Sequence, residues 1–98
     1  MDIIKNIEEK KVEIKLIGRL DTTTAPLLEA ELKTSLNDVE ELDFNFEELD
    51  YISSAGLRVL LAAQKVMNRQ GVMKLHNVKP EVMEVLEITG FLNILSVE

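Results

Sequence analysis

Apolar and charged residues alternate near the start of the chain, where every second residue is apolar over Val12–Leu16. A period of two places alternate side chains on opposite faces of a strand, so this stretch predicts an opening hairpin over residues 2–18. Residues 42–46 repeat the period, and we expect Asp43 and Asn45 to lie on the less buried face. Two shorter stretches nearer the C-terminus also predict strands: residues 72–76 and 94–97.

Three other segments carry apolar residues at helical spacing. The first follows Thr24, a predicted N-cap, and its apolar positions include Leu27, Leu28, Leu32 and Leu36. Pro26 is compatible with the first turn of this helix. The second helix is predicted to have its N-cap at Ser54 and to stop at Gly71. The third spans residues 80–88, with three residues expected to face inward: Val82, Val85 and Leu86.

Helices alternate with strands after the hairpin, which predicts an α/β fold. We expect a mixed sheet of about four to five strands with helices packed on it. The length of 98 residues is that of one ordinary domain, and no linker or repeat divides it. The sequence therefore predicts a single domain over residues 1–98.

Composition and charge exclude several classes of function. The absence of cysteine excludes disulfides, thiolate catalysis and sulfur-bound metals. The net charge of −7 argues against nucleic acid as a partner, because affinity for phosphates rests on accumulated Lys and Arg. No apolar run approaches the roughly 18 residues of a membrane span, and the N-terminus lacks the features of a secretory signal. We expect a cytoplasmic protein without membrane insertion.

The segment from Tyr51 to Leu61 passes abruptly from a strand-like stretch to a helix through two serines and a glycine. A serine at this point can simply cap the helix. The same point also suits an anion, because free N–H groups and the positive end of the helix dipole converge there. Gly56 costs about 0.8–1 kcal/mol in a helix relative to Ala, which indicates close approach by a strand or a partner. This segment alone leaves a structural cap and a functional site as equal alternatives.

The run Asp50-Tyr51-Ile52-Ser53-Ser54-Ala55-Gly56-Leu57-Arg58-Val59-Leu60-Leu61 resembles the signature of the STAS-domain family, in particular the bacterial anti-sigma factor antagonists. Two further motifs extend the resemblance over nearly the whole chain. Gly18-Arg19-Leu20-Asp21 is similar to the family's turn after the opening hairpin, and Ile88-Thr89-Gly90-Phe91 is similar to its motif near the end.

The resemblance implies a mixed sheet backed by helices and a partner-switching role. In such systems the unmodified antagonist binds an anti-sigma factor that is also an ATP-using serine kinase, and this frees a sigma factor. The kinase then phosphorylates the antagonist and releases it, and a metal-dependent serine phosphatase resets it. By position the acceptor is Ser54, two residues before Gly56. Relatives often carry aspartate where this chain has Ser53, so Ser53 is the alternative acceptor. An N-cap at Ser54, with its oxygen facing the N–H groups of Gly56 and Leu57, favours Ser54.

The resemblance also implies that the loop of Asp21, Thr22 and Thr23 lies near the loop of Ser53 and Ser54, and a partner-binding surface is predicted around both loops. Alternatives remain open for several of its members. The threonines can be helix-capping residues of a turn, Arg58 can be a solvated side chain, and the excess of apolar residues over 57–70 can be a second buried face instead of a partner groove. The predicted surface comprises Asp21, Thr22, Thr23, Ser53, Ser54, Ala55, Gly56, Leu57, Arg58 and Leu61.

An enzyme is not expected. A nucleophilic serine needs a base and an oxyanion pocket, yet His76 is the only histidine and no Gly-x-Ser-x-Gly motif exists. No phosphate-binding glycine loop and no cluster of metal ligands is present, so we expect neither cofactor nor metal. The competing interpretation is a STAS subunit of a lipid-transport ATPase complex or of a stress-signalling scaffold, which shares the fold without being phosphorylated.

Overall fold

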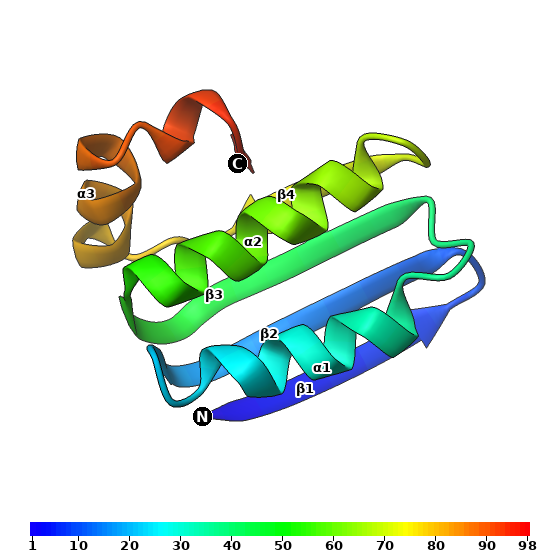
Figure 1. The fold of residues 1–98 in the computed structure, drawn as a ribbon, viewed down its shortest axis with the longest axis horizontal. Coiled ribbons are helices and arrows are strands. Elements are labelled where there is room, and N and C mark those ends of the chain that lie inside the picture. Colours follow the sequence, from blue (N-terminus) through cyan, green and yellow to red (C-terminus); the bar gives the residue numbers. More distant parts are fainter.

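The computed structural model describes all residues from Met1 to Glu98. Its elements follow one another around a single sheet (Figure 1). In chain order they are β1 (Asp2–Glu8), β2 (Lys11–Leu20), α1 (Ala25–Ser35), β3 (Glu41–Ile52), α2 (Ser54–Met67), β4 (Val72–His76), α3 (Pro80–Ile88), the 3-10 turn η1 (Phe91–Asn93) and β5 (Ser96–Val97).

The sheet has five strands in the order β1-β2-β3-β4-β5. β1 and β2 form the antiparallel hairpin, and the remaining neighbours are parallel. This confirms the predicted mixed sheet with its opening hairpin. No helix is long and apolar enough to cross a bilayer.

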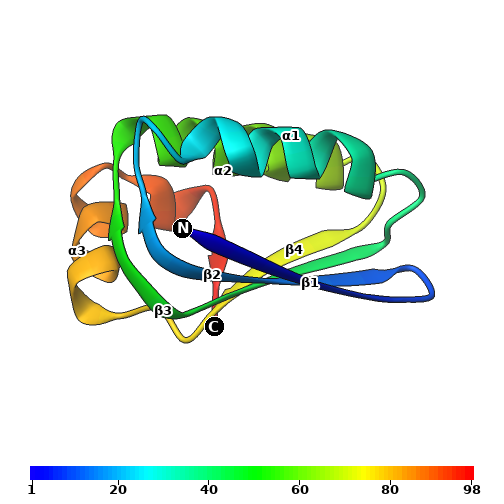
Figure 2. The same cartoon turned by 90° about the horizontal axis from the view of Figure 1, so that it is seen from below.

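The helices α1 and α2 lie side by side over one face of the sheet, whereas α3 packs at one end beside β3 (Figure 2). The alternating residues of β2 supply the core beneath these helices: Val12, Ile14 and Leu16 are all buried. From β3 the two phenylalanines of the predicted apolar face, Phe44 and Phe46, are fully buried with ring centroids 5.8 Å apart. The period of two therefore placed the core correctly in these strands.

The strand β3 runs unbroken to Ile52, although the sequence suggested two separate stretches. Register shifts relative to β2 occur between Lys15 and Ile17 and between Gly18 and Arg19, each with an extra residue on the β3 side. In the first of them the Asn45 side chain accepts a hydrogen bond from the Glu47 N–H at 3.0 Å. These bulges break the period of two and bend the strand, as bulges do.

Asp43 was expected on a less buried face, and this expectation is wrong. Its side chain lies on the sheet face opposite the helices but is only 7% exposed. Lys11 lies 3.4 Å from one carboxylate oxygen and His76 lies 3.6 Å from the other. Side chains of the two neighbouring strands therefore cover it. Asn45, on the same face, is half-buried, in agreement with the prediction.

Several other expectations need correction. Leu27 is 56% exposed, because it points away from the sheet while Leu28 and Leu32 face it. The helix α2 ends at Met67 instead of reaching Gly71, and the intervening residues form turns. Val85 of α3, by contrast, is half-buried and packs against the core, so it faces inward as expected. The last strand is shorter than residues 94–97, because η1 and the turn after it extend to Leu95.

Candidate partner-binding site

The two loops of the predicted site lie next to each other at the carboxyl-terminal ends of β2 and β3. β2 and β3 are parallel, so the loop that leads into α1 and the loop that leads into α2 leave the sheet on the same side. The Ser53 N–H donates a hydrogen bond to the Leu20 carbonyl at 2.9 Å, which joins the two loops directly. The structure thus brings Asp21–Thr23 next to Ser53–Arg58, as predicted from the sequence.

The Asp21 carboxylate organises the first loop. Its Oδ1 accepts hydrogen bonds from the Thr23 hydroxyl at 2.8 Å and from the N–H groups of Thr23 and Thr24 at 3.0 and 3.1 Å. These donors, the Thr23 hydroxyl first, lower the pKa of Asp21 to about 2. The loop is therefore built around a permanently charged carboxylate at neutral pH.

Thr24 occupies the N-cap position of α1 but does not cap the helix with its side chain. Its hydroxyl donates to the Arg19 carbonyl at 2.7 Å and accepts from the Asp21 N–H at 2.8 Å. The predicted position of the cap is confirmed. The Thr24 side chain, however, binds the backbone of the preceding loop instead of the helix N–H groups. Thr22 is exposed.

The start of α2 differs from the prediction by one residue. Ser53, not Ser54, is the N-cap, and its Oγ accepts a hydrogen bond from the Gly56 N–H at 3.5 Å. Ser53 is still extended, with φ −103° and ψ 175°, since its N–H is bonded to the end of β2. The argument that Ser54 faces the free N–H groups of the helix is therefore wrong.

This shift separates the two hydroxyls. Ser53 is half-buried and its oxygen is directed to the helix backbone, whereas Ser54 is the first residue of α2 and is exposed. The guanidinium of Arg58, one turn further, lies against it: Nη2 donates to Ser54 Oγ at 3.5 Å and Nε donates to the Ser54 carbonyl at 3.4 Å. Of the two serines, Ser54 therefore presents the accessible hydroxyl.

Gly56 and Leu57 face the core. A Cβ atom on Gly56 would lie 2.7 Å from Cγ of Leu20 and 3.1 Å from Cγ1 of Ile52. The close approach that Gly56 indicates is therefore made by β2 and β3. Of the ten residues predicted for partner binding, these two position the surface from beneath, Ala55 and Leu61 are half-buried, and Arg58 is exposed.

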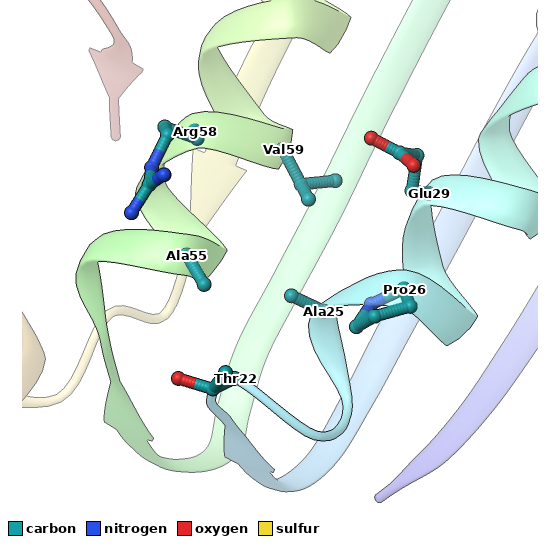
Figure 3. Close-up of a pocket in the computed structure, with 7 residues that line it drawn as sticks. All are labelled: Thr22, Ala25, Pro26, Glu29, Ala55, Arg58 and Val59. Atoms are coloured by element: carbon teal, nitrogen blue, oxygen red, sulfur yellow. The ribbon is translucent and has the colours of Figure 1, made fainter.

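A hollow of about 240 Å³ lies between the start of α1 and the start of α2 (Figure 3). Arg58 and Glu29 stand on opposite sides of it, and the Thr22 hydroxyl lies at its lower edge in this view. Four of its lining residues were not predicted as site residues from the sequence: Ala25, Pro26, Glu29 and Val59. Pro26 and Glu29 are exposed and three residues apart, so they lie on one outer face of α1. The helical spacing that predicted the buried face of α1 also identifies this exposed face.

The side chains of the site offer hydroxyls, the carboxylates of Asp21 and Glu29 and the guanidinium of Arg58, with no imidazole among them. No three histidine or acidic side chains anywhere in the chain converge to hold a metal ion. His76 lies at the far face of the sheet, near Asp43 and Glu98.

The sequence profile of the STAS domain matches residues 2–98. The chain belongs to the STAS-domain family. A Bordetella bronchiseptica protein assigned as an anti-sigma factor antagonist, BtrV, is 45% identical over 84 residues, which cover 84% of this chain and 72% of BtrV. The anti-sigma-B factor antagonist of Bacillus subtilis is 26% identical over 98 residues, covering 99% of this chain and 88% of the relative.

The fold of this STAS protein is also that of solved antagonist structures. The phosphorylated form of the Bacillus cell fate determinant SpoIIAA superposes with a TM-score of 0.77 at 22% identity, over 99% of this chain and 91% of that chain. The resemblance stated from the sequence is thereby confirmed at the level of family and fold.

Proposed function

We propose that this protein is an anti-sigma factor antagonist that acts as a partner switch controlled by phosphorylation of Ser54. The unmodified form binds an anti-sigma factor that is also a serine kinase, and a sigma factor is freed. The kinase transfers the γ-phosphoryl group of ATP to Ser54 Oγ, ADP and the hydroxyl proton leave, and the antagonist dissociates. A metal-dependent serine phosphatase hydrolyses the phosphoester and restores the binding form.

The position of Ser54 is the observation that carries the proposal. Its hydroxyl is exposed at the first residue of α2, where the positive end of the helix dipole favours an anion. It also stands two residues before Gly56, the position that the family pattern assigns to the acceptor. Ser53 is a poorer acceptor, because it is half-buried and caps the helix.

Charge explains how the modification can release the partner. A phosphate adds about −1.5 to −2 to a chain that already carries −7. The helix start tolerates this charge locally, but a partner docked over Ser54 would have to desolvate it. Release therefore needs no unfolding of the domain.

The names of the relatives support the sigma-factor output. BtrV and the Bacillus subtilis protein are both named as anti-sigma factor antagonists, and the SpoIIAA structure is that of a phosphorylated protein. We extend these properties to the present chain because its accessible serine lies at the start of the helix that carries the family motif.

The test compares three variants of the chain purified from its own cells. We expect mass spectrometry to find phosphate on Ser54 and on no other residue. The kinase should co-purify with wild type and Ser54→Ala, whereas Ser54→Glu should fold normally and bind at least about tenfold more weakly. Ser53→Ala is the matched control, since it alters the neighbouring hydroxyl and should still be phosphorylated at Ser54.

Two results would contradict the proposal. One is a folded Ser54→Glu protein that binds the kinase as tightly as wild type does. The other is the absence of phosphate in every growth state together with a transport ATPase or a scaffold complex in the co-purified material. The second result would support the competing interpretation, in which the chain is a STAS subunit of a larger complex and is not phosphorylated.

A further inference from the structure

Arg58 is the one cation whose hydrogen bonds go to Ser54. Both of its contacts, to Ser54 Oγ and to the Ser54 carbonyl, are long, at 3.5 and 3.4 Å. None of the ion pairs within the chain includes Arg58. The guanidinium is thus exposed, weakly held, and not neutralised by any carboxylate of its own chain.

We propose that Arg58 captures the phosphate on Ser54, so that phosphorylation withdraws a free cation from the partner-binding surface at the same time as it adds an anion. This inference rests on the proposed function, whose modified residue it concerns. In the unmodified form Arg58 is available to an acidic group of the partner. In the phosphorylated form it is occupied within the chain.

The geometry favours capture without rearrangement. A phosphate attached to Ser54 Oγ extends its oxygens from an atom that is already 3.5 Å from Nη2. A guanidinium offers a planar fork of donors that fits phosphate oxygens in pairs. Residues four apart on a helix are neighbours, and the order of acid before base is the favourable one.

The other nearby arginine is already engaged. Arg19 lies 3.7 Å from the Asp21 carboxylate, and its guanidinium stacks over Tyr51 at 4.1 Å from the ring centre. Moving Arg19 to the phosphate would break both contacts. Arg58 is therefore the side chain that can pair with the phosphate at no loss of an existing ion pair.

The first experiment installs phosphoserine at position 54 during translation, which makes the measurement independent of any kinase. The second ionisation of the phosphate is followed by 31P NMR against pH in wild type, Arg58→Gln, Arg58→Lys and Arg69→Gln. Arg69 is the matched control, because it is an exposed arginine of the turn after α2 and makes no ion pair.

A nearby cation favours the dianion, so its removal should shift the titration to higher pH. We expect Arg58→Gln to raise the midpoint by about 0.3–0.5 pH unit, Arg58→Lys to raise it by less, and Arg69→Gln to leave it unchanged. High salt should reduce the difference. Equal midpoints for Arg58→Gln and Arg69→Gln would overturn the inference.

A second experiment measures binding of the unmodified variants to the kinase that co-purifies with wild type. Arg58→Gln should weaken this binding by about two- to fivefold, and Arg69→Gln should not change it. If wild type and Arg58→Gln bind equally, the cation is not withdrawn from an interface and the inference fails. A 31P shift in a protein that carries no phosphate in its own cells would contradict the proposed function alone.

Discussion

Ser53 and Ser54 differ in what surrounds their oxygens, although they are adjacent in the chain. The extended backbone at Ser53 turns its oxygen to the Gly56 N–H, and the first helical residue, Ser54, turns its hydroxyl to solvent. A shift of the cap by one residue would exchange these positions. The assignment of the modified serine therefore depends on where the helix starts.

Gly56 fixes that start by letting α2 approach the ends of two strands. We expect Gly56→Ala to lower the free energy of unfolding by about 1–2 kcal/mol, because overpacking against Leu20 and Ile52 outweighs the gain in helix propensity. Chemical denaturation measures the loss.

Leu20→Ala supplies the control for this prediction. It removes the Cγ atom that the new methyl group would meet at 2.7 Å and leaves the contact with Ile52 at 3.1 Å, so the further loss caused by Gly56→Ala should become smaller in the double variant. If the losses in free energy of unfolding caused by the two substitutions simply add, the close contact with Leu20 is not the cause of the loss in Gly56→Ala.

At the scale of elements, the loop before α1 depends on the ionised Asp21. Its pKa of about 2 in the folded chain lies below the value of about 3.9 expected in the unfolded chain. The stabilisation is therefore fully present above about pH 4 and is lost as the pH falls through about 2.

We expect Asp21→Asn to be less stable than wild type at pH 5, and the difference between them to shrink as the pH falls towards 2. Urea unfolding at several pH values measures it. Asp2→Asn is a suitable control, because it removes one exposed negative charge outside the loop. A difference that stays constant from pH 5 to pH 2 would contradict this account of the loop.

The sequence predicted most elements because their periodicity is uninterrupted. The helix over Pro80–Ile88 and the strand over Val72–His76 have the predicted bounds. The full length of β3 was missed, because each of its two bulges separates buried residues by three positions: Phe46 from Leu49 at the first and Leu49 from Ile52 at the second. No local pattern distinguishes such a bulge from the end of a strand.

Part of the candidate site was predictable, because the family resemblance implied that its two loops are neighbours. Neighbouring parallel strands bring their following loops together, which accounts for the meeting of Asp21–Thr23 with Ser53–Arg58. The N-cap was misplaced, since the hydrogen bond from the Ser53 N–H to Leu20 joins residues far apart in the chain and leaves no mark in the sequence. The burial of Asp43 by side chains of β2 and β4 was missed for the same reason.

For the whole molecule, the position of Ser54 outside the core predicts a switch that acts at the surface. The residues beneath it, Leu20, Ile52 and Leu57, belong to one continuous core that includes the central strands. Close-packed interiors resist small displacements, and an anion at a helix start contributes about 0.3–1 kcal/mol of stability. We therefore expect the form with phosphoserine installed at position 54 to melt within about 5 °C of the unmodified form.

Hydrogen exchange tests whether the change stays local. Installed phosphoserine should slow amide exchange in the first turn of α2, because the phosphate pairs with Arg58 one turn further along the helix, and leave β2, β3 and β4 unchanged. A glutamate at position 54 should reproduce the effect only weakly, because a carboxylate carries less charge and fewer acceptor oxygens than a phosphate. Faster exchange in β2 and β3 would mean that phosphorylation loosens the core, and release of the partner would then follow from unfolding instead of from charge at the surface.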